Sequence, residues 1–132
     1  MLIEIKTPKT QLLNGQYRGN AYSISTELSG AVVQVANYKS SLQSEYHKLV
    51  QDKDEMEAFE PNCVVIIGNY SREINQSSVK KKSLGLFRSH LKDIEIITYD
   101  ELFGKVQFLV DLLEGKSGNN IPNKEDDFDV PF

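Results

Sequence analysis

The amino-acid sequence predicts an α/β fold, in which a sheet with parallel strands packs against helices. Three observations predict it. The first residues alternate between apolar and charged side chains, as the residues of a half-buried strand do. Two short apolar runs rich in β-branched residues, at 63–67 and 94–98, are typical of buried strands. Apolar residues recur at helical spacing between and after these runs, so strands and helices alternate along the chain.

The beginning of the chain predicts a strand followed by a loop. The strand is expected at 2–7 and ends before Pro8, because proline has no N–H to give to a strand ladder. Residues 9–24 are polar and contain turn-forming pairs with glycine. They predict a loop with a short hairpin around Tyr17.

Two helices and a strand are predicted in the middle of the chain. The first helix is expected from a capping Ser25 or Thr26 to about Leu49. Its apolar residues form one stripe: Leu28, Ala31, Val32, Val35, Leu42, Tyr46 and Leu49. The strand at 63–67 follows, and then the polar residues 69–76, which predict a loop. A second helix is expected to begin after a capping Ser77 or Ser78 and to direct four apolar residues inward: Val79, Leu84, Phe87 and Leu91.

The last predicted elements are the strand at 94–98 and a helix that Asp100 caps and Gly115 ends. That helix carries apolar residues at helical spacing: Leu102, Val106, Leu109, Val110 and Leu113. Residues 1–115 are then expected to form one α/β domain, and residues 116–132 a disordered acidic tail. A length of 132 residues with 39% hydrophobic side chains supports one core rather than two.

The charge of the chain is unevenly distributed. The net charge of −4 excludes a generally basic nucleic-acid coat protein. Most of the acidic excess lies at 52–60 and 124–132, so the remainder is mildly basic and compatible with a local DNA site. Cys63 has no partner for a disulfide, which predicts a reducing cytoplasm. No apolar run approaches the roughly 20 residues of a spanning helix, so no membrane partner is expected.

The first strand carries a pair of residues suited to metal-assisted hydrolysis. Glu4 and Lys6 are two residues apart, so their side chains share one face, and Ile3 and Ile5 are expected to face the core. Glu4 would bind a hard cation such as Mg²⁺, with the carbonyl of Ile5 as a further ligand. Lys6 would orient the attacking water. A solvated ion pair on an edge strand is the simpler alternative.

The long helix carries a second polar group. Glu27, Gln34 and Tyr38 lie along one edge of this helix, beside its apolar stripe. Amide and phenol groups donate to phosphate oxygens without reading base sequence. The alternative is an ordinary boundary between the buried and solvated sides of a helix.

Together these motifs resemble those of a known enzyme superfamily. The Glu4-Ile5-Lys6 strand followed by a helix with Gln34 and Tyr38 resembles the E-x-K strand and Q-x-x-x-Y helix of PD-(D/E)XK nucleases. The finer pattern over roughly residues 2–112 is similar to the nuclease domain of Shedu-type anti-phage defence proteins. Its further matching pieces are Thr7-Pro8, Tyr17-Arg18, Ser25-Thr26-Glu27-Leu28, Val65-Ile66-Ile67-Gly68 and Tyr99-Asp100-Glu101-Leu102.

The resemblance implies a restriction-endonuclease-like mixed sheet flanked by helices and a DNA endonuclease that uses Mg²⁺ or Mn²⁺. It implies that Glu4 binds the metal and that Lys6 is the catalytic lysine. Gln34 and Tyr38 correspond to the two residues of the family's helix motif. Arg18 and Glu27 are implied more weakly, in contact with phosphate or beside the metal ligands.

One part of the family pattern is not matched. The family has an acidic residue on a strand before its Glu-x-Lys strand, preceded by a helix and hairpin, whereas only three residues precede Glu4 here. We therefore expect this chain alone to be a poor nuclease. A longer parent protein, a shortened gene or completion by another chain would each account for the difference. A homo-oligomer is a separate expectation. The alternative function is a catalytically inactive DNA-binding or interaction module.

The second helix and the residues before it contain a basic cluster that could follow a DNA backbone through phosphate contacts. The cluster comprises Arg72, Lys80, Lys81, Lys82 and Arg88. A solvated helix face is the alternative, and it is the commoner role of a run of lysines.

The end of the sequence resembles the acidic C-terminal tip of bacterial single-stranded-DNA-binding proteins. The resemblance implies that this tip binds a DNA-repair protein, with the terminal residue in an apolar pocket rimmed by basic side chains. The residues concerned are Asp127, Asp129, Pro131 and Phe132. A tail that only improves solubility is the alternative.

Overall fold

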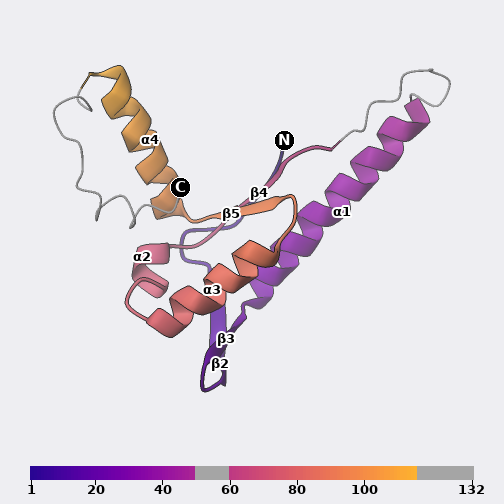
Figure 1. Cartoon of the computed structure of the whole chain (residues 1–132). Coiled ribbons are helices and arrows are strands. Elements are labelled where there is room, and N and C mark those ends of the chain that lie inside the picture. Colours follow the sequence, from indigo (N-terminus) through magenta and orange to yellow (C-terminus); the bar gives the residue numbers. More distant parts are fainter. Residues whose placement is uncertain (50–59, 116–132) are drawn as a thin grey trace.

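The computed structural model describes residues 1–49 and 60–115 of the chain (Figure 1). Three parallel strands form a sheet in the order β1 (Leu2–Ile5), β4 (Cys63–Ile66), β5 (Ile94–Ile97). Strands β2 (Leu13–Arg18) and β3 (Ala21–Ile24) form a separate antiparallel hairpin. The α/β class and the hairpin around Tyr17 are confirmed. The expected mixed sheet is not found within the described residues, because the antiparallel pairing is confined to the hairpin.

Four helices accompany the strands in the described part of the chain. They are α1 (Thr26–Leu49), α2 (Tyr70–Glu73), α3 (Ser78–His90) and α4 (Tyr99–Leu113). The long first helix and the helix that follows residue 77 are confirmed. The Ser77 hydroxyl caps α3 by accepting from the Lys80 N–H at 3.2 Å.

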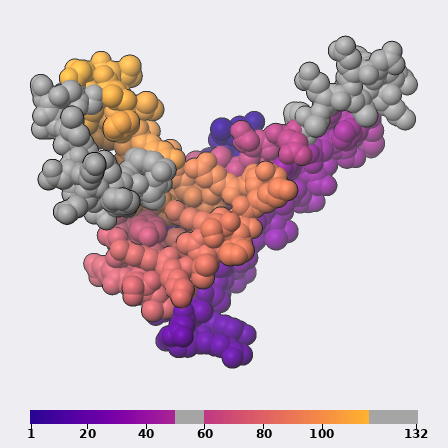
Figure 2. All heavy atoms as spheres, viewed as in Figure 1, coloured from indigo at the N-terminus to yellow at the C-terminus, as the bar shows by residue number. Residues whose placement is uncertain are grey.

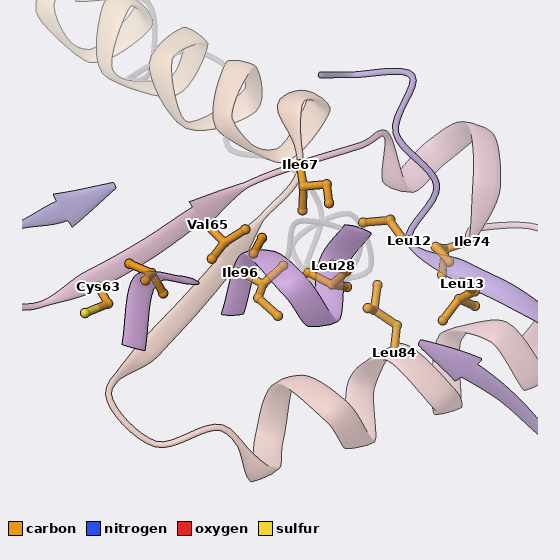
Figure 3. Close-up of a cluster of buried hydrophobic side chains, with 11 residues drawn as sticks. Leu12, Leu13, Leu28, Cys63, Val65, Ile67, Ile74, Leu84 and Ile96 are labelled. Atoms are coloured by element: carbon orange, nitrogen blue, oxygen red, sulfur yellow. The ribbon is translucent and has the colours of Figure 1, made fainter. Parts of the chain in front are cut away.

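The core lies on the face of the sheet where α1 and α3 meet (Figure 3). Leu28 of α1, Val65 of β4 and Leu84 of α3 are each completely buried. Leu12, just before the hairpin, packs into the same cluster, which ties the hairpin to the sheet. The inward orientation predicted for Leu84, Phe87 and Leu91 is confirmed, since Leu84 is buried and the other two pack against the core.

The orientation predicted for β1 is wrong. Ile3 and Ile5 are 51% and 64% exposed, whereas Leu2 on the opposite face packs against the core. Helix α1 covers the face that carries Leu2 and Glu4, and the described residues leave the isoleucine face open. Side-chain alternation determines which residues share a face, but the packing of helices decides which face is covered.

Two local predictions are also corrected. Residues 69–76 contain one helical turn, α2, whose first turn is capped by the Asn69 side chain. A single turn is too short to show helical periodicity in the sequence. Helix α4 is capped by Thr98 in a capping box with Glu101, and Asp100 accepts hydrogen bonds from α2 instead.

Two helical segments project from the body of the molecule (Figure 2). The second half of α1 extends beyond the sheet, so Leu42 and Leu49 of the predicted apolar stripe are exposed. Helix α4 extends in another direction, and most of its apolar residues are exposed as well. None of the described helices is long and apolar enough to cross a membrane. The acidic stretch 52–59 and the tail 116–132 lie outside the described residues.

Candidate functional site

The candidate site lies on β1, close to the edge of the sheet where the parallel strands end. The ladder continues one residue past β1, since the Lys6 N–H donates to the Ile66 carbonyl at 2.8 Å. The Tyr99 hydroxyl donates to the Lys6 carbonyl at 2.6 Å. The backbone of Lys6 is therefore held from β4 and from the first residue of α4. Ligand sites of open α/β sheets commonly lie at this edge.

The loop after Lys6 packs tightly against the end of β4. The Gly68 N–H donates to the Thr7 carbonyl at 3.0 Å. Gly68 has a φ of +70°, and a Cβ atom there would lie 2.9 Å from both Leu12 Cγ and the Thr10 carbonyl oxygen. A glycine is required at this position for both reasons, and it lets the loop approach the sheet closely.

Glu4 and Lys6 lie on one face of β1, as predicted, and both are half-buried. Among the described residues, neither side chain forms a hydrogen bond or an ion pair, and the two are not paired with each other. The structure therefore has no direct Glu4–Lys6 ion pair. A carboxylate and an ammonium share one face of a fixed backbone, and neither has a protein partner among the described residues.

The backbone of β1 presents oxygen atoms at the open edge of the sheet. The N–H groups of Leu2 and Lys6 both donate toward the β4 side. Peptide groups alternate in direction along a strand, so the carbonyl of Ile5 faces the opposite side. Among the described strands none pairs with that edge of β1. The Ile5 carbonyl is thus available as a ligand.

Helix α1 brings its polar group alongside β1. Glu27 lines a pocket with Thr7 at the carboxyl edge of the sheet, and Lys39 pairs with Asp93 at the amino edge at 3.7 Å. Helix α1 therefore runs antiparallel to the strands. Gln34 is seven helical residues from Glu27, about 10 Å along the axis. Glu4 is three strand residues from Thr7, also about 10 Å, so Gln34 is level with Glu4.

Gln34 and Tyr38 act as a pair on the exposed side of α1. The Gln34 side-chain amide donates to the Tyr38 hydroxyl oxygen at 2.6 Å. The hydroxyl hydrogen of Tyr38 and the second amide hydrogen of Gln34 therefore remain available for another acceptor. Tyr38 is 48% exposed, so an acceptor in solution can reach this pair.

The donor atoms on β1 are of the type that Mg²⁺ prefers. The Glu4 carboxylate and the Ile5 carbonyl are hard oxygen ligands, and Mg²⁺ typically retains several waters beside one or two carboxylates. Among the described residues there is no group of three His, Cys, Asp or Glu side chains able to hold a metal. The oxygen set fits Mg²⁺ or Mn²⁺ as a partial site, with a single carboxylate from β1.

The structure separates the members of the predicted basic cluster. Lys81 and Lys82 are exposed on α3, whereas Arg72 donates to the Pro8 carbonyl at 2.9 Å. Arg88 forms two hydrogen bonds with the buried carboxylate of Glu101, at 2.6 and 2.9 Å. The Arg88 charge is therefore balanced inside the protein.

Arg18 lies on the hairpin and is not part of the predicted basic cluster. It lies at the end of β2 with its guanidinium 5.5 Å from the centre of the Tyr17 ring. The residues expected to bind a partner through the tail, Asp127, Asp129, Pro131 and Phe132, lie outside the described residues.

The sequence-based reasoning missed the residues that support the site. Asp100 accepts hydrogen bonds from the N–H groups of Tyr70 and Ser71 and from the hydroxyls of Ser71 and Thr98. Partial burial raises the pKa of Asp100. The four hydrogen bonds lower it by more than burial raises it, so the pKa is about 2. Burial raises the pKa of Tyr70, against the influence of nearby Arg88. The run 99–102 signalled this cluster only through its resemblance to a family motif.

Two comparisons with known proteins identify the family of the chain. The family model described as "Shedu protein SduA, C-terminal" matches residues 1–103. The Shedu protein SduA of Bacillus cereus (strain B4264) is 40% identical over 122 residues, which cover 87% of this chain. The match covers 32% of that relative, so the chain spans about a third of its length. The chain thus belongs to the family of Shedu SduA C-terminal domains, the family that its sequence motifs resemble.

Proposed function

We propose that this domain is the metal-dependent DNA endonuclease core of an anti-phage defence protein and has the restriction-endonuclease-like fold of PD-(D/E)XK enzymes. One observation carries the proposal. Glu4 and Lys6 share a face of an edge strand that α1 covers, Glu4 is at about the height of Gln34 along the sheet, and neither charge has a partner among the described residues. Half-buried charges without a partner are unfavourable for stability and are therefore common at functional sites.

The proposed chemistry is the hydrolysis of a phosphodiester bond. Glu4 and the Ile5 carbonyl would hold Mg²⁺ or Mn²⁺, which supplies Lewis-acid stabilisation of charge on the phosphate when it is bound. The Lys6 ammonium would orient the attacking water and stabilise the negative charge that develops on the phosphate oxygens. Gln34 and Tyr38 would donate hydrogen bonds that position the backbone.

Lys6→Ala tests the catalytic assignment. We expect Mg²⁺-dependent nicking of supercoiled plasmid DNA by this chain to be weak and to fall about 100-fold or more in the variant, because one charge-stabilising group is lost. DNA binding should persist. Lys92→Ala, at an exposed position beyond α3, is the matched control and should nick as the parent does. Equal nicking rates for Lys6→Ala and the parent would refute the assignment.

The metal assignment has a separate readout. Binding of Mn²⁺, followed by electron paramagnetic resonance, should weaken in Glu4→Gln and remain in Lys6→Ala. The reason is that only the first substitution removes a ligand. If Mn²⁺ bound equally well to Glu4→Gln and to the parent, Glu4 would not be a ligand.

A second candidate function is an inactive DNA-binding or interaction module. The observation that favours it is the single carboxylate at the candidate metal site, because the described residues offer no cluster of three potential ligands. This alternative predicts DNA binding without Mg²⁺-dependent nicking in both the parent and Lys6→Ala. Its proposed partners are DNA, a further copy of the chain, and a DNA-repair protein bound by the C-terminal tip.

A further inference from the structure

Three cations that are distant in sequence converge beside the candidate site. Lys9, Arg72 and Lys80 line one open pocket of about 490 Å³, together with Gln11 and Glu73. Lys9 comes from the loop after β1, Arg72 from α2 and Lys80 from the first turn of α3. Lys9 was not part of the basic cluster predicted from the sequence.

The carboxylate in this pocket is already engaged. Both oxygens of Glu73 accept from the Leu12 N–H, at 2.8 and 2.7 Å. In the part of the chain that the structure describes, no ion pair involves Lys9, Arg72 or Lys80. The pocket therefore holds three cationic groups against one carboxylate, an excess of positive charge that favours an anion.

Two of the three cationic groups have contacts that orient them. The Arg72 guanidinium donates to the Pro8 carbonyl at 2.9 Å, which leaves its other N–H groups for a ligand. The half-buried Lys80 ammonium lies 5.4 Å from the centre of the Tyr22 ring. Gln11 also lines the pocket. Guanidinium and ammonium donors around one space suit the oxygens of a phosphate group.

The pocket is close to the proposed reaction centre. Lys9 is three residues beyond Lys6, so their Cα atoms are at most about 11 Å apart. A second pocket of about 300 Å³ shares Lys9 and Gln11 and continues to Thr7 and Glu27. Phosphates of one DNA strand follow each other at about 3.4 Å along the helix axis. A phosphate held in this pocket would therefore lie within a few nucleotides of a phosphate held at Lys6.

From this geometry we propose that the pocket lined by Lys9, Arg72 and Lys80 binds a DNA backbone phosphate a few nucleotides from the hydrolysed bond. The proposal rests on the proposed DNA substrate and extends it, because it assigns where the strand is held outside the reaction centre. Lys81, Lys82 and Arg88 are not part of this pocket.

The test measures DNA affinity and its salt dependence separately from cleavage. Fluorescence anisotropy with a labelled duplex, in EDTA and over a salt series, compares Lys9→Gln/Lys80→Gln with the charge-matched control Lys48→Gln/Lys92→Gln. The pocket variant should bind about tenfold or more weakly, and its slope of log K against log salt should be smaller by about two. The control should retain the parent's slope. For Arg72→Gln, the slope of log K against log salt should be smaller by about one. A urea melt should show that this variant is folded.

Each outcome decides between the proposals. If the pocket variant keeps the control's affinity and slope, or if the parent does not bind DNA, the phosphate pocket is refuted. If the slope falls as expected while no Mg²⁺-dependent nicking occurs in any protein, the phosphate pocket stands and the nuclease proposal fails. If nicking depends on Lys6 but binding does not depend on the pocket, only the nuclease proposal stands.

Discussion

Tyr99 shows how single residues support the candidate site from a distant part of the sequence. Its hydroxyl holds the Lys6 carbonyl, and its N–H donates to the Gly68 carbonyl at 3.0 Å. One residue at the start of α4 thus fixes both the proposed catalytic lysine and the glycine that lets the loop approach. We regard Tyr99 as a positioning residue, since it acts on the site through Lys6.

Asp100 predicts a measurable acid dependence of stability. The four hydrogen bonds to its carboxylate keep the pKa at about 2 in the folded chain, below its ordinary value of 3.8. Because the pKa of Asp100 is lower in the folded chain than in the unfolded chain, its ionised carboxylate stabilises the fold at pH values above about 4. This contribution is lost as the pH falls from about 4 to about 2. Asp100→Asn should lower the free energy of unfolding at pH 7 by about 1 kcal/mol, allowing for solvent screening.

Urea unfolding at pH 7 and at pH 3 checks this prediction. The difference between Asp100→Asn and the parent should shrink at the lower pH, because the parent then begins to lose the same contribution. Asp111→Asn, on the exposed part of α4, is the control and should follow the parent. A difference that stays constant with pH would contradict the assigned role of the Asp100 carboxylate.

At the scale of elements, one ion pair joins α3 to α4. The side chain of Glu101 is 3% exposed and that of Arg88 22%, and their two hydrogen bonds bridge the helices. The same carboxylate accepts from the Thr98 N–H at 3.0 Å and completes the cap of α4. The pair therefore links helix capping, a local feature, to helix packing.

Removing one partner of this pair should be strongly destabilising. Glu101→Gln leaves the Arg88 charge largely buried without its carboxylate, at an expected cost of about 3 kcal/mol in the free energy of unfolding. Glu95→Gln removes the carboxylate of a more exposed pair with Lys105 and should cost at most about 1 kcal/mol. Chemical denaturation of both variants gives the comparison. Similar costs for the two substitutions would show that burial does not determine the strength of the Arg88 pair.

At the scale of the whole molecule, α4 exposes an apolar stripe. Val106, Leu109 and Leu113 lie on one side of the helix and are 50%, 57% and 87% exposed. Contiguous apolar surface of this kind commonly marks an interaction site. A homo-oligomer, in which a further copy of the chain covers the stripe, is a prediction that this surface makes testable.

Leu109→Gln/Leu113→Gln should therefore shift the chain toward the monomer in sedimentation velocity measured over a range of protein concentrations. Phe108→Gln removes an apolar side chain that is 56% exposed but lies outside the stripe, and it should not change the distribution. A parent chain that remains monomeric at all concentrations would contradict the expectation.

The sequence by itself determined the features that depend on local periodicity. The order of the sheet strands and the longer helices, the shared face of Glu4 and Lys6, and the common edge of α1 that carries Gln34 and Tyr38 follow from repeats of two and of about four residues. The single turn α2 does not follow from them. The motifs also indicated the family correctly. Each of these features depends on residues that are near one another in the sequence.

Only the tertiary structure decided which surfaces are covered and which distant charges meet. Alternation alone cannot distinguish the two faces of β1, and the packing of α1 left Ile3 and Ile5 exposed. Arg88 forms its ion pair with Glu101, and Lys9 lines a pocket together with Arg72 and Lys80. Both arrangements bring together elements that are separate in the chain. The physical reason is that charge and hydrophobicity make many such pairings favourable, and the packing of the elements selects among them.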